Sequence, residues 1–371
     1  MKRLSSAEKM VLLGLLTYPD RKDMDIAEML SLPNSTFASV KSRISEMGYL
    51  NEIYVPVFPA LGFELIATVY SDFNPSVSVE ERIDNTRRTV EVYPEMVLSI
   101  GESHRGFSIS VAENVTRIMS ISHERIKILA DMNLLEIELP QEVLFPFEMS
   151  HVHRFFNLAP LFHARLERED PALIEEIGFP SEDIRKHDNI LNADRGSMRS
   201  RPADVNLSRK QLEVMYYLVK YPHMSASALS STIPYSRHTI SRVRDMLINE
   251  GYIRKMVVPD LSRIGYSILS LFHVKIDPKR PLSERSCNDR ALLQDDTVFF
   301  ISRPTELIML ALYENYPLYN RGMSSFNQFL KANEHMLKIP TIRNHSLSEA
   351  IWVKNLVHHP LIKETFHLDV E

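Results

Sequence analysis

Cationic and hydrogen-bonding side chains gather on one face of residues 235–255, where they could contact an anionic polymer. Ile240, Val243 and Leu247 recur at helical spacing, so they predict a helix whose opposite face is exposed. Short polar and basic side chains on such a face can donate hydrogen bonds to base edges in the DNA major groove and to phosphates. The residues for which we expect this role are Arg237, His238, Thr239, Ser241, Arg242 and Arg244.

The two ends of this helix are also predicted by its sequence. Ser236 is placed to cap the first turn, and Gly251 can adopt the left-handed conformation that ends a helix. Residues 252–258 are rich in aliphatic and β-branched side chains and predict a strand. A basic helix followed by a β-hairpin is typical of the recognition helix and wing of a winged helix-turn-helix domain.

The charge of the chain is unevenly distributed. The whole chain has 43 Lys and Arg against 48 Asp and Glu, a net charge of -5, which argues against a surface that coats nucleic acid. Residues 206–255 instead carry eight Lys or Arg against three Asp or Glu. A local basic surface of this kind matters more for DNA binding than the total charge. A solvated helix face is the simpler alternative for this segment.

The chain contains an internal repeat. Residues 4–63 align with residues 207–266 without a gap. The shared landmarks are Tyr18-Pro19 with Tyr221-Pro222, Gly48-Tyr49-Leu50 with Gly251-Tyr252-Ile253, Pro56 with Pro259, and Gly62-Phe63 with Gly265-Tyr266. Apolar periodicity alone does not produce such coincidences, so the repeat indicates a duplication.

The first copy predicts a second winged helix with a less cationic outer face. Ser5 or Ser6, with Glu8 behind it, predicts the start of the first helix, and residues 33–47 predict the last one. Its candidate DNA contacts are Asn34, Ser35, Ser39, Lys41 and Arg43. Because fewer of them are cations, DNA binding by the two recognition helices should differ in salt dependence and in base preference.

Each winged helix is followed by a βαββαβ pattern. In the first copy we expect strands at residues 64–73, 96–102, 106–112 and 135–143, and helices at 78–92 and 116–132. In the second copy we expect strands at residues 268–276, 298–302, 307–313 and 337–343, and helices at 283–293 and 320–336. Each copy then adds a terminal helix, at residues 149–168 or 346–366. The predicted fold class is therefore α+β, with two winged helix-turn-helix domains each followed by a ferredoxin-like domain.

Five segments follow from these elements. Residues 1–60 and 206–263 are the two winged helices, 61–170 and 264–371 are the two ferredoxin-like domains with their terminal helices, and 171–205 is a linker. Arg195, Arg199 and Arg201 in the linker could touch a DNA backbone, although incidental charge in a flexible segment explains them as well.

A winged helix followed by a βαββαβ domain resembles the Lrp/AsnC (feast/famine) family of transcription regulators. The resemblance covers most of both copies and depends on the Gly-Tyr landmarks at Gly48 and Gly251, on Gly62 and Gly265, and on the hairpin-like residues 99–111. It implies that the two copies form a covalently linked pseudo-dimer with two different DNA-recognition helices.

The resemblance also implies an effector site at the ferredoxin-like domains. Family members often bind amino acids or other small effectors near the loop equivalent to residues 101–106. We expect Glu102, His104 and Arg105 as the candidate effector-binding residues in the first copy. An exposed charged hairpin is the simpler interpretation of the same three residues.

Other chemistry finds little support in the sequence. There is one cysteine, Cys287, and there is no Gly-Lys-Ser/Thr loop, no GxGxxG after a strand, no GxSxG and no HExxH. His151 and His153 lie two apart in a predicted helix and so should not share a face, which argues against a metal site there. We therefore expect no catalytic residues, no metal and no cofactor.

These observations favour a sequence-specific DNA-binding transcription regulator over an enzyme. The expected partners are double-stranded DNA, a small effector and a second copy of the chain, in the cytoplasm and without a membrane segment. Two alternatives remain open. One is a tetrapyrrole enzyme on the same scaffold, since siroheme decarboxylases resemble Lrp-type regulators. The other is a protein-interaction scaffold that has kept its winged helices without binding DNA.

Overall fold

A computed structural model describes residues 4–102, 104–135, 138–191, 201–283 and 292–370. The chain divides into two compact units. Unit 1 comprises residues 1–53, 151–190 and 255–348, and unit 2 comprises residues 54–150, 191–254 and 349–371. Each unit therefore combines segments from both halves of the repeat.

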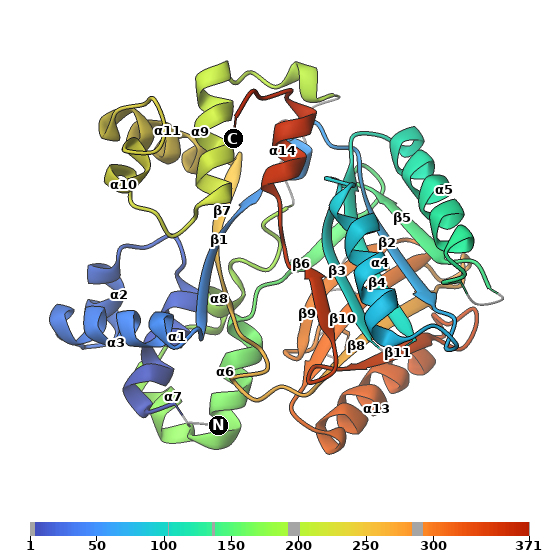
Figure 1. Cartoon of the computed structure of the whole chain (residues 1–371). Helices are drawn as coiled ribbons and strands as arrows, with labels where there is room; N and C mark the ends of the chain where they lie inside the picture. Colours follow the sequence, from blue (N-terminus) through green and yellow to red (C-terminus); the bar gives the residue numbers. More distant parts are fainter. Residues whose placement is uncertain (1–3, 103, 136–137, 192–200, 284–291, 371) are drawn as a thin grey trace. The chain divides into compact units, whose positions relative to one another are not determined.

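Unit 1 contains the first winged helix and the second of the two sheets (Figure 1). Its helices are α1 (Ser6–Thr17), α2 (Asp23–Met29), α3 (Asn34–Glu46), α6 (Ala159–Glu169), α7 (Pro171–Ile177), α8 (Ser181–Arg185) and α13 (Tyr316–Ala332). Its strands are β6 (His151–Phe155), β8 (Ile268–Lys275), β9 (Thr297–Arg303), β10 (Glu306–Tyr313) and β11 (Thr341–Ser346). They form a five-stranded sheet in the order β11-β8-β10-β9-β6, and α13 packs on one face of it.

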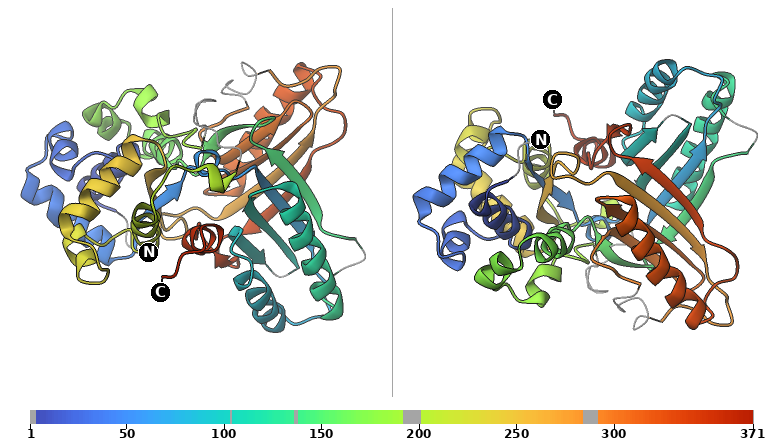
Figure 2. Two further views of the ribbon diagram at one scale, coloured as in Figure 1. Left: turned by 90° about the horizontal axis from the view of Figure 1, so that it is seen from above. Right: turned by 90° about the horizontal axis from the view of Figure 1, so that it is seen from below.

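Unit 2 contains the second winged helix and the first of the two sheets. Its helices are α4 (Val79–Glu91), α5 (Val115–Asp131), α9 (Arg209–Lys220), α10 (Ala226–Ser230), α11 (Arg237–Asn249) and α14 (His359–Thr365), with 3-10 turns η1 (Phe58–Leu61) and η3 (Pro202–Asp204). Its strands are β2 (Leu65–Asp72), β3 (Met96–Glu102), β4 (Arg105–Ala112), β5 (Gln141–Pro146) and β12 (Ile351–Lys354). The sheet order is β12-β3-β4-β2-β5, and α4 and α5 lie on one face of the sheet (Figure 2).

The two sheets have the same topology, which confirms the predicted α+β class with its winged helices and ferredoxin-like domains. Counted from one edge, β12, β3, β4, β2 and β5 of unit 2 correspond to β6, β9, β10, β8 and β11 of unit 1. The predicted helix ends agree as well. Ser5 forms a capping box with Glu8, Ser236 accepts from the Thr239 amide, and Gly251 has a φ of 77°.

The predicted terminal helices are wrong in their first halves. Residues 151–155 and 351–354 are the strands β6 and β12, and each completes the sheet built by the other half of the repeat. Alternating β-branched and aromatic residues favour a strand in these segments. The helices begin only at the prolines, since Pro160 and Pro360 occupy the first turns of α6 and α14.

The strands after the two recognition helices also differ from the expected wings. β1 (Leu50–Pro56) and β7 (Ile253–Pro259) pair with each other in a two-stranded sheet, and the division between the units falls within both strands. An edge strand satisfies its free amide and carbonyl groups with whatever strand can reach it, and local sequence does not specify that partner.

Other predicted segments lie partly outside the described residues. Of the predicted helix at 283–293, residues 284–291 are not described, nor are Arg195, Arg199 and Cys287. The strand predicted at 135–143 is observed as β5 at Gln141–Pro146, with an isolated bridge between Phe73 and Leu135. The segment predicted as a linker contains α7 and α8. Among the described residues, no helix is both long and apolar enough to cross a membrane.

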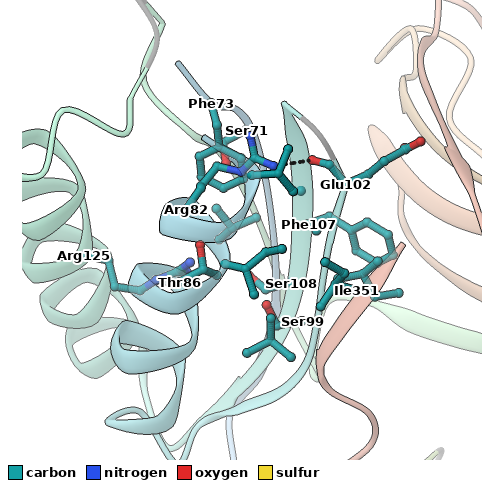
Figure 3. A pocket seen from close by; sticks show the side chains of 17 residues that line it. Ser71, Phe73, Arg82, Thr86, Ser99, Glu102, Phe107, Ser108, Arg125 and Ile351 are labelled. Atoms are coloured by element: carbon teal, nitrogen blue, oxygen red, sulfur yellow. Dashed lines mark hydrogen bonds between the residues drawn. The ribbon is translucent and has the colours of Figure 1, made fainter. Parts of the chain in front are cut away.

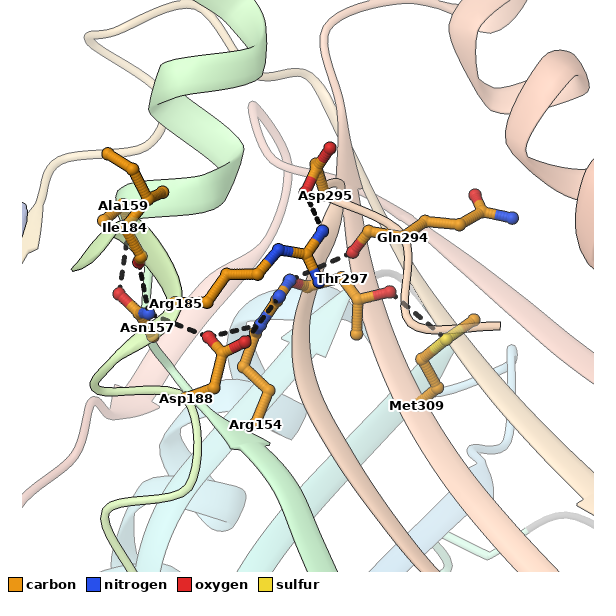
Figure 4. Close-up of polar contacts among 10 residues, drawn as sticks. All are labelled: Arg154, Asn157, Ala159, Ile184, Arg185, Asp188, Gln294, Asp295, Thr297 and Met309. Carbon is orange, nitrogen blue, oxygen red and sulfur yellow. Dashed lines mark hydrogen bonds and ion pairs between the residues drawn. The ribbon is translucent and has the colours of Figure 1, made fainter. Parts of the chain in front are cut away.

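A buried ion pair fixes β6 to the rest of unit 1 (Figure 4). The guanidinium of Arg154 is fully buried and donates two hydrogen bonds of 2.8 Å to the carboxylate of Asp188. It also donates to the carbonyl oxygens of Thr297 (2.7 Å) and Gln294 (3.0 Å). Asn157 donates to the same carboxylate at 2.8 Å. Because these oxygens accept hydrogen bonds from the guanidinium, Arg154 can stay charged in the interior without contacting water.

Candidate ligand pocket

The residues predicted to contact DNA lie on the surfaces of α11 and α3. On α11, Arg237, His238 and Arg242 are exposed, Ser241 and Thr239 are half-buried, and Arg244 donates to Asp245 at 3.0 Å. On α3, Asn34, Ser35 and Ser39 are exposed. Lys41 lies between Asp23 (2.9 Å) and Glu52 (3.2 Å), and Arg43 contacts Glu8 at 2.9 Å. Both candidate DNA-binding cations of α3 thus already form ion pairs within unit 1.

The three candidate effector residues are near one another but do not form one site. Glu102 and Arg105 are opposite each other in the register of β3 and β4. Arg105 is 3.6 Å from Asp72, and His104 is exposed. Of the three, Glu102 borders the pocket described below, which lies next to the loop that the sequence indicates.

This pocket lies in unit 2, between α4 and the sheet (Figure 3). The cavity has a volume of about 30 Å³, enough for about one or two water molecules and well below the usual range of small-molecule sites. Val79, Arg82, Ile83 and Thr86 line it from α4. Their spacing places them on one face of that helix, the face toward the sheet.

Small residues on the strands create the space. In the sheet of unit 2, Val69, Ser108 and Ser99 are neighbours across β2, β4 and β3, and the next row is Ser71, Gly106 and Gly101. All six residues line the pocket. A Cβ atom added at Gly101 would meet no atom within 4 Å.

The equivalent rows of unit 1 carry large apolar side chains instead. They are Phe272, Met309 and Phe300, followed by Val274, Leu307 and Ser302. All of these except Ser302 belong to one buried core cluster with α13. The same fold is therefore filled with large side chains in unit 1 and keeps a small cavity in unit 2, and the difference is encoded at equivalent strand positions.

Arg82 carries a positive charge into the pocket of unit 2. Its side chain is only 4% exposed, its guanidinium lies 5.6 Å from the centre of the Phe73 ring, and one nitrogen donates to the Glu102 carbonyl at 3.3 Å. No carboxylate of the described residues lies within 4 Å of it to form an ion pair. Burial lowers the pKa of Arg82.

Arg125 brings a second guanidinium from α5. Its Nε atom is buried and has no hydrogen-bond partner among the described residues. Burial lowers the pKa of Arg125 to about 10, although the charges of Tyr93 and Glu142 act in the opposite direction. Two arginines without a paired carboxylate in one pocket are unusual, because a buried charge is normally neutralised by a partner.

The structure corrects the interpretation of His151 and His153. Both lie on the strand β6, where residues two apart share a face, and their ring centres are 4.5 Å apart. His153 is hydrogen-bonded to Ser302 at 2.8 Å, and burial lowers its pKa to about 3. Among the described residues there is no cluster of three or more potential metal ligands.

Another buried histidine, His358, should make unit 2 sensitive to acid. Burial, with a smaller effect of the His359 charge, lowers the pKa of His358 to about 3. The unfolded chain binds a proton at this residue below about pH 6.5 and the folded chain does not, so stability falls as the pH falls. The contribution is about 1.4 kcal/mol per pH unit.

We predict that His358→Leu reduces the loss of stability between pH 6.5 and pH 5 by about 2 kcal/mol. Leucine is the residue at the equivalent position of the first half, Leu158. Urea denaturation at the two pH values measures the effect. An unchanged pH dependence in the variant would show that His358 is protonated in the folded state.

Two solved structures of one enzyme are similar to this chain. No protein-family model matches the chain, and no curated protein matches it. The chain is similar to the crystal structure of the siroheme decarboxylase NirDL over 98% of its own length and 99% of that chain, with a TM-score of 0.49 and 8% identity. It is also similar to that enzyme in co-complex with an iron-uroporphyrin III analogue, over 93% and 92% of the chains, with a TM-score of 0.45 and 6% identity.

These findings correct two expectations drawn from the sequence. The similar solved structures are those of an enzyme and not of a regulator, so they contradict the interpretation as a DNA-binding transcription regulator and the expectation of no enzyme, and we set both aside. The paired cations of α3 agree with this correction. The fold implied by the resemblance to Lrp/AsnC proteins is kept, and the regulatory function that the resemblance implied is not.

Sequence reasoning missed the residues that define the pocket. Arg82 and Arg125 are single cations in helices rich in charge, and nothing in their spacing separates them from solvated residues. A detectable signal lies in the strands. Ser99, Gly106 and Ser108 occupy positions where the second half of the repeat has Phe300, Leu307 and Met309.

Proposed function

We propose that unit 2 binds a small organic carboxylate through the pocket between α4 and the sheet. The observation that carries the proposal is the pair of arginines, Arg82 and Arg125, that line this pocket without a carboxylate partner among the described residues. A guanidinium is a planar donor that matches a carboxylate in a two-bond arrangement.

Charge supports an anionic ligand over a neutral one. Removing a guanidinium from water is costly, and an attractive anion in the same low-dielectric space offsets that cost. The Glu102 side chain, the one carboxylate on the lining, points away from the pocket in Figure 3. A bound carboxylate would supply the missing negative charge.

Apolar surface supports a hydrophobic frame behind the charged group. Val69, Phe73, Ile83, Ile351 and Val353 line the pocket together with the arginines. Burying aliphatic or aromatic ligand atoms against these side chains contributes about 25 cal/mol per Å² of apolar surface. The expected ligand class is thus an organic acid and not an inorganic anion.

Binding can be detected before the natural ligand is known. We expect the smallest carboxylates, such as formate and acetate, to raise the thermal unfolding temperature, since a ligand at 100 times its dissociation constant stabilises by about 2.7 kcal/mol. In Arg82→Gln the affinity should fall by about tenfold or more, the value of a hydrogen bond to a charged group. Arg87→Gln, an exposed position on the same helix, is the matched control. Equal affinities of the Arg82→Gln variant and the native chain would refute this site.

A second candidate is an enzyme that acts on a carboxylated tetrapyrrole. Such a ligand combines an apolar macrocycle with several carboxylates; the cavity of about 30 Å³ is too small for the macrocycle, so its guanidiniums would take one carboxylate arm only. Binding of siroheme should shift its Soret band, and decarboxylation should yield a product lighter by the mass of carbon dioxide. An unshifted spectrum would exclude siroheme while leaving the carboxylate site intact.

A further inference from the structure

We infer that unit 2 has a second binding site, for an organic cation with a guanidinium group, in a groove between α14, the end of α4 and the start of α5. The groove has a volume of about 470 Å³, which lies in the usual range of small-molecule sites. It shares no lining residue with the pocket beside Arg82, so the inference does not depend on the proposed function.

The lining of this groove carries an excess of negative charge. Its carboxylates are those of Glu91, Glu95, Glu113 and Glu364, and Arg117 is the one lining cation among the described residues. Arg117 donates to one oxygen of Glu95 at 2.5 Å. The other oxygen, Oε2, is buried without a hydrogen-bond partner in the described part of the chain, and Glu95 as a whole is only 7% exposed. A buried carboxylate normally has both oxygens hydrogen-bonded, so this side chain points to a missing cation.

A nearby lysine on β12 leaves this charge without an ion pair. Lys354 is buried, and its Nζ atom donates to the Tyr93 carbonyl at 2.8 Å and not to a carboxylate. Burial lowers the pKa of Lys354 to about 8, although the charges of Glu95 and Glu91 act in the opposite direction. A bound cation would therefore offset charge that the described residues do not neutralise themselves.

The equivalent place in unit 1 already holds guanidinium groups. Glu314 corresponds to Glu113, because each directly precedes the asparagine that caps the next helix, α13 or α5. Glu314 forms ion pairs with two side chains of α6, Arg168 and Arg165, the latter at 3.8 Å. In one copy of the repeat, the cation for this carboxylate thus comes from the terminal helix of the chain itself.

The terminal helix of unit 2 lacks both cations. In the alignment of α14 on α6, Thr365 and Leu368 stand at the positions of Arg165 and Arg168. Thr365 lines the groove, and its side chain is far shorter than that of the arginine it replaces. An external cation would take the place of the missing side chain.

The lining also indicates the rest of the ligand. A guanidinium binds a carboxylate through two parallel hydrogen bonds, which an ammonium group does not provide. Val92, Pro94 and Leu361 add apolar surface on which an aliphatic chain can be buried. An alkylguanidinium combines both groups, either as a free small molecule or as the arginine side chain of a peptide.

Isothermal titration calorimetry of the whole chain with butylguanidinium tests the inference, with butylammonium and butanol as matched probes. Low ionic strength limits the screening of the carboxylates. We expect butylguanidinium to bind about tenfold more tightly than butylammonium, the value of one added charge-assisted hydrogen bond, and butanol not to bind. N-acetylarginine amide separates the two sources. Tighter binding than that of butylguanidinium assigns the site to arginine side chains of a peptide, and weaker binding assigns it to a free cation.

Two substitutions assign the binding to this groove. Glu113→Gln should weaken butylguanidinium binding by about tenfold or more, whereas Glu80→Gln, at an exposed position of α4 outside the groove, should not. Thr365→Arg copies Arg165 and should abolish binding, because the chain then supplies its own guanidinium. Thr365→Gln lengthens the side chain without a charge and should still bind.

Thermal unfolding of each variant shows that it is folded before it is titrated. No binding of butylguanidinium to the native chain would overturn the inference. Unchanged affinity in Glu113→Gln and Thr365→Arg would overturn it too, since the cation would then bind elsewhere. An equal loss in Glu80→Gln would assign the binding to general surface charge and not to the groove.

Discussion

Replacing Asp188 with alanine is expected to lower the free energy of unfolding by about 3–5 kcal/mol, because it leaves the buried Arg154 charged and without its carboxylate. The guanidinium would keep two carbonyl acceptors, from Thr297 and Gln294. Neither carbonyl carries a net charge, so neither can replace the ion pair. β6 should then detach from β9 more easily than any other strand of unit 1.

Urea denaturation measures this loss, and Asn189→Ala is the control, since Asn189 is exposed and adjacent. The double replacement of Arg154 and Asp188 by leucine should recover a large part of the stability, because removing both charges leaves no unpaired ion. A loss below about 1 kcal/mol in Asp188→Ala would mean that water reaches Arg154 and the pair is not structural.

Replacing Ser108 with methionine should abolish ligand binding while keeping the fold. The equivalent residue in unit 1 is Met309, which fills the same space between sheet and helix. A flexible methionine adapts to an irregular cavity and buries apolar surface there. We therefore expect affinity for carboxylates to fall by about a hundredfold or more, and because methionine is larger than the cavity, we expect overpacking to cost about 1–3 kcal/mol of stability without unfolding the chain.

Thermal denaturation with and without the acid measures both effects in one experiment. Ser120→Met, on the exposed side of α5, is the matched control and should bind as the native chain does. If Ser108→Met binds normally, the ligand lies elsewhere. If it binds poorly but also unfolds at a much lower temperature, overpacking of the core is the cause.

Local sequence was sufficient to predict the helices and the strands that each copy builds for itself. The capping box of Ser5 and Glu8, the cap at Ser236 and the positive φ at Gly251 are decided by a few neighbouring residues. The exchange of β6 and β12 between the halves is not decided locally. Each is a short segment whose strand partner is more than a hundred residues away, and its pattern also fits the start of a helix.

The functional site was hidden from the sequence for a related reason. Arg237 and Arg242 form a conspicuous basic face on an exposed helix, and this face suggested DNA. Arg82 and Arg125 are chemically as capable but are separated in the chain and come together only when α4 and α5 pack on the sheet. The absence of an ion pair between either arginine and a carboxylate, among the described residues, is a property of the folded structure alone.

Hydrogen–deuterium exchange with and without a saturating small carboxylate, such as acetate, tests the central claim most directly. The claim is that the space between α4 and the sheet of unit 2 takes an organic acid, whereas the equivalent space of unit 1 is filled by its own side chains. It predicts slower exchange in residues 79–91 and 96–112 and no change in residues 297–313. Protection confined to unit 1, or no protection in residues 79–112 while the acid is bound, would contradict it.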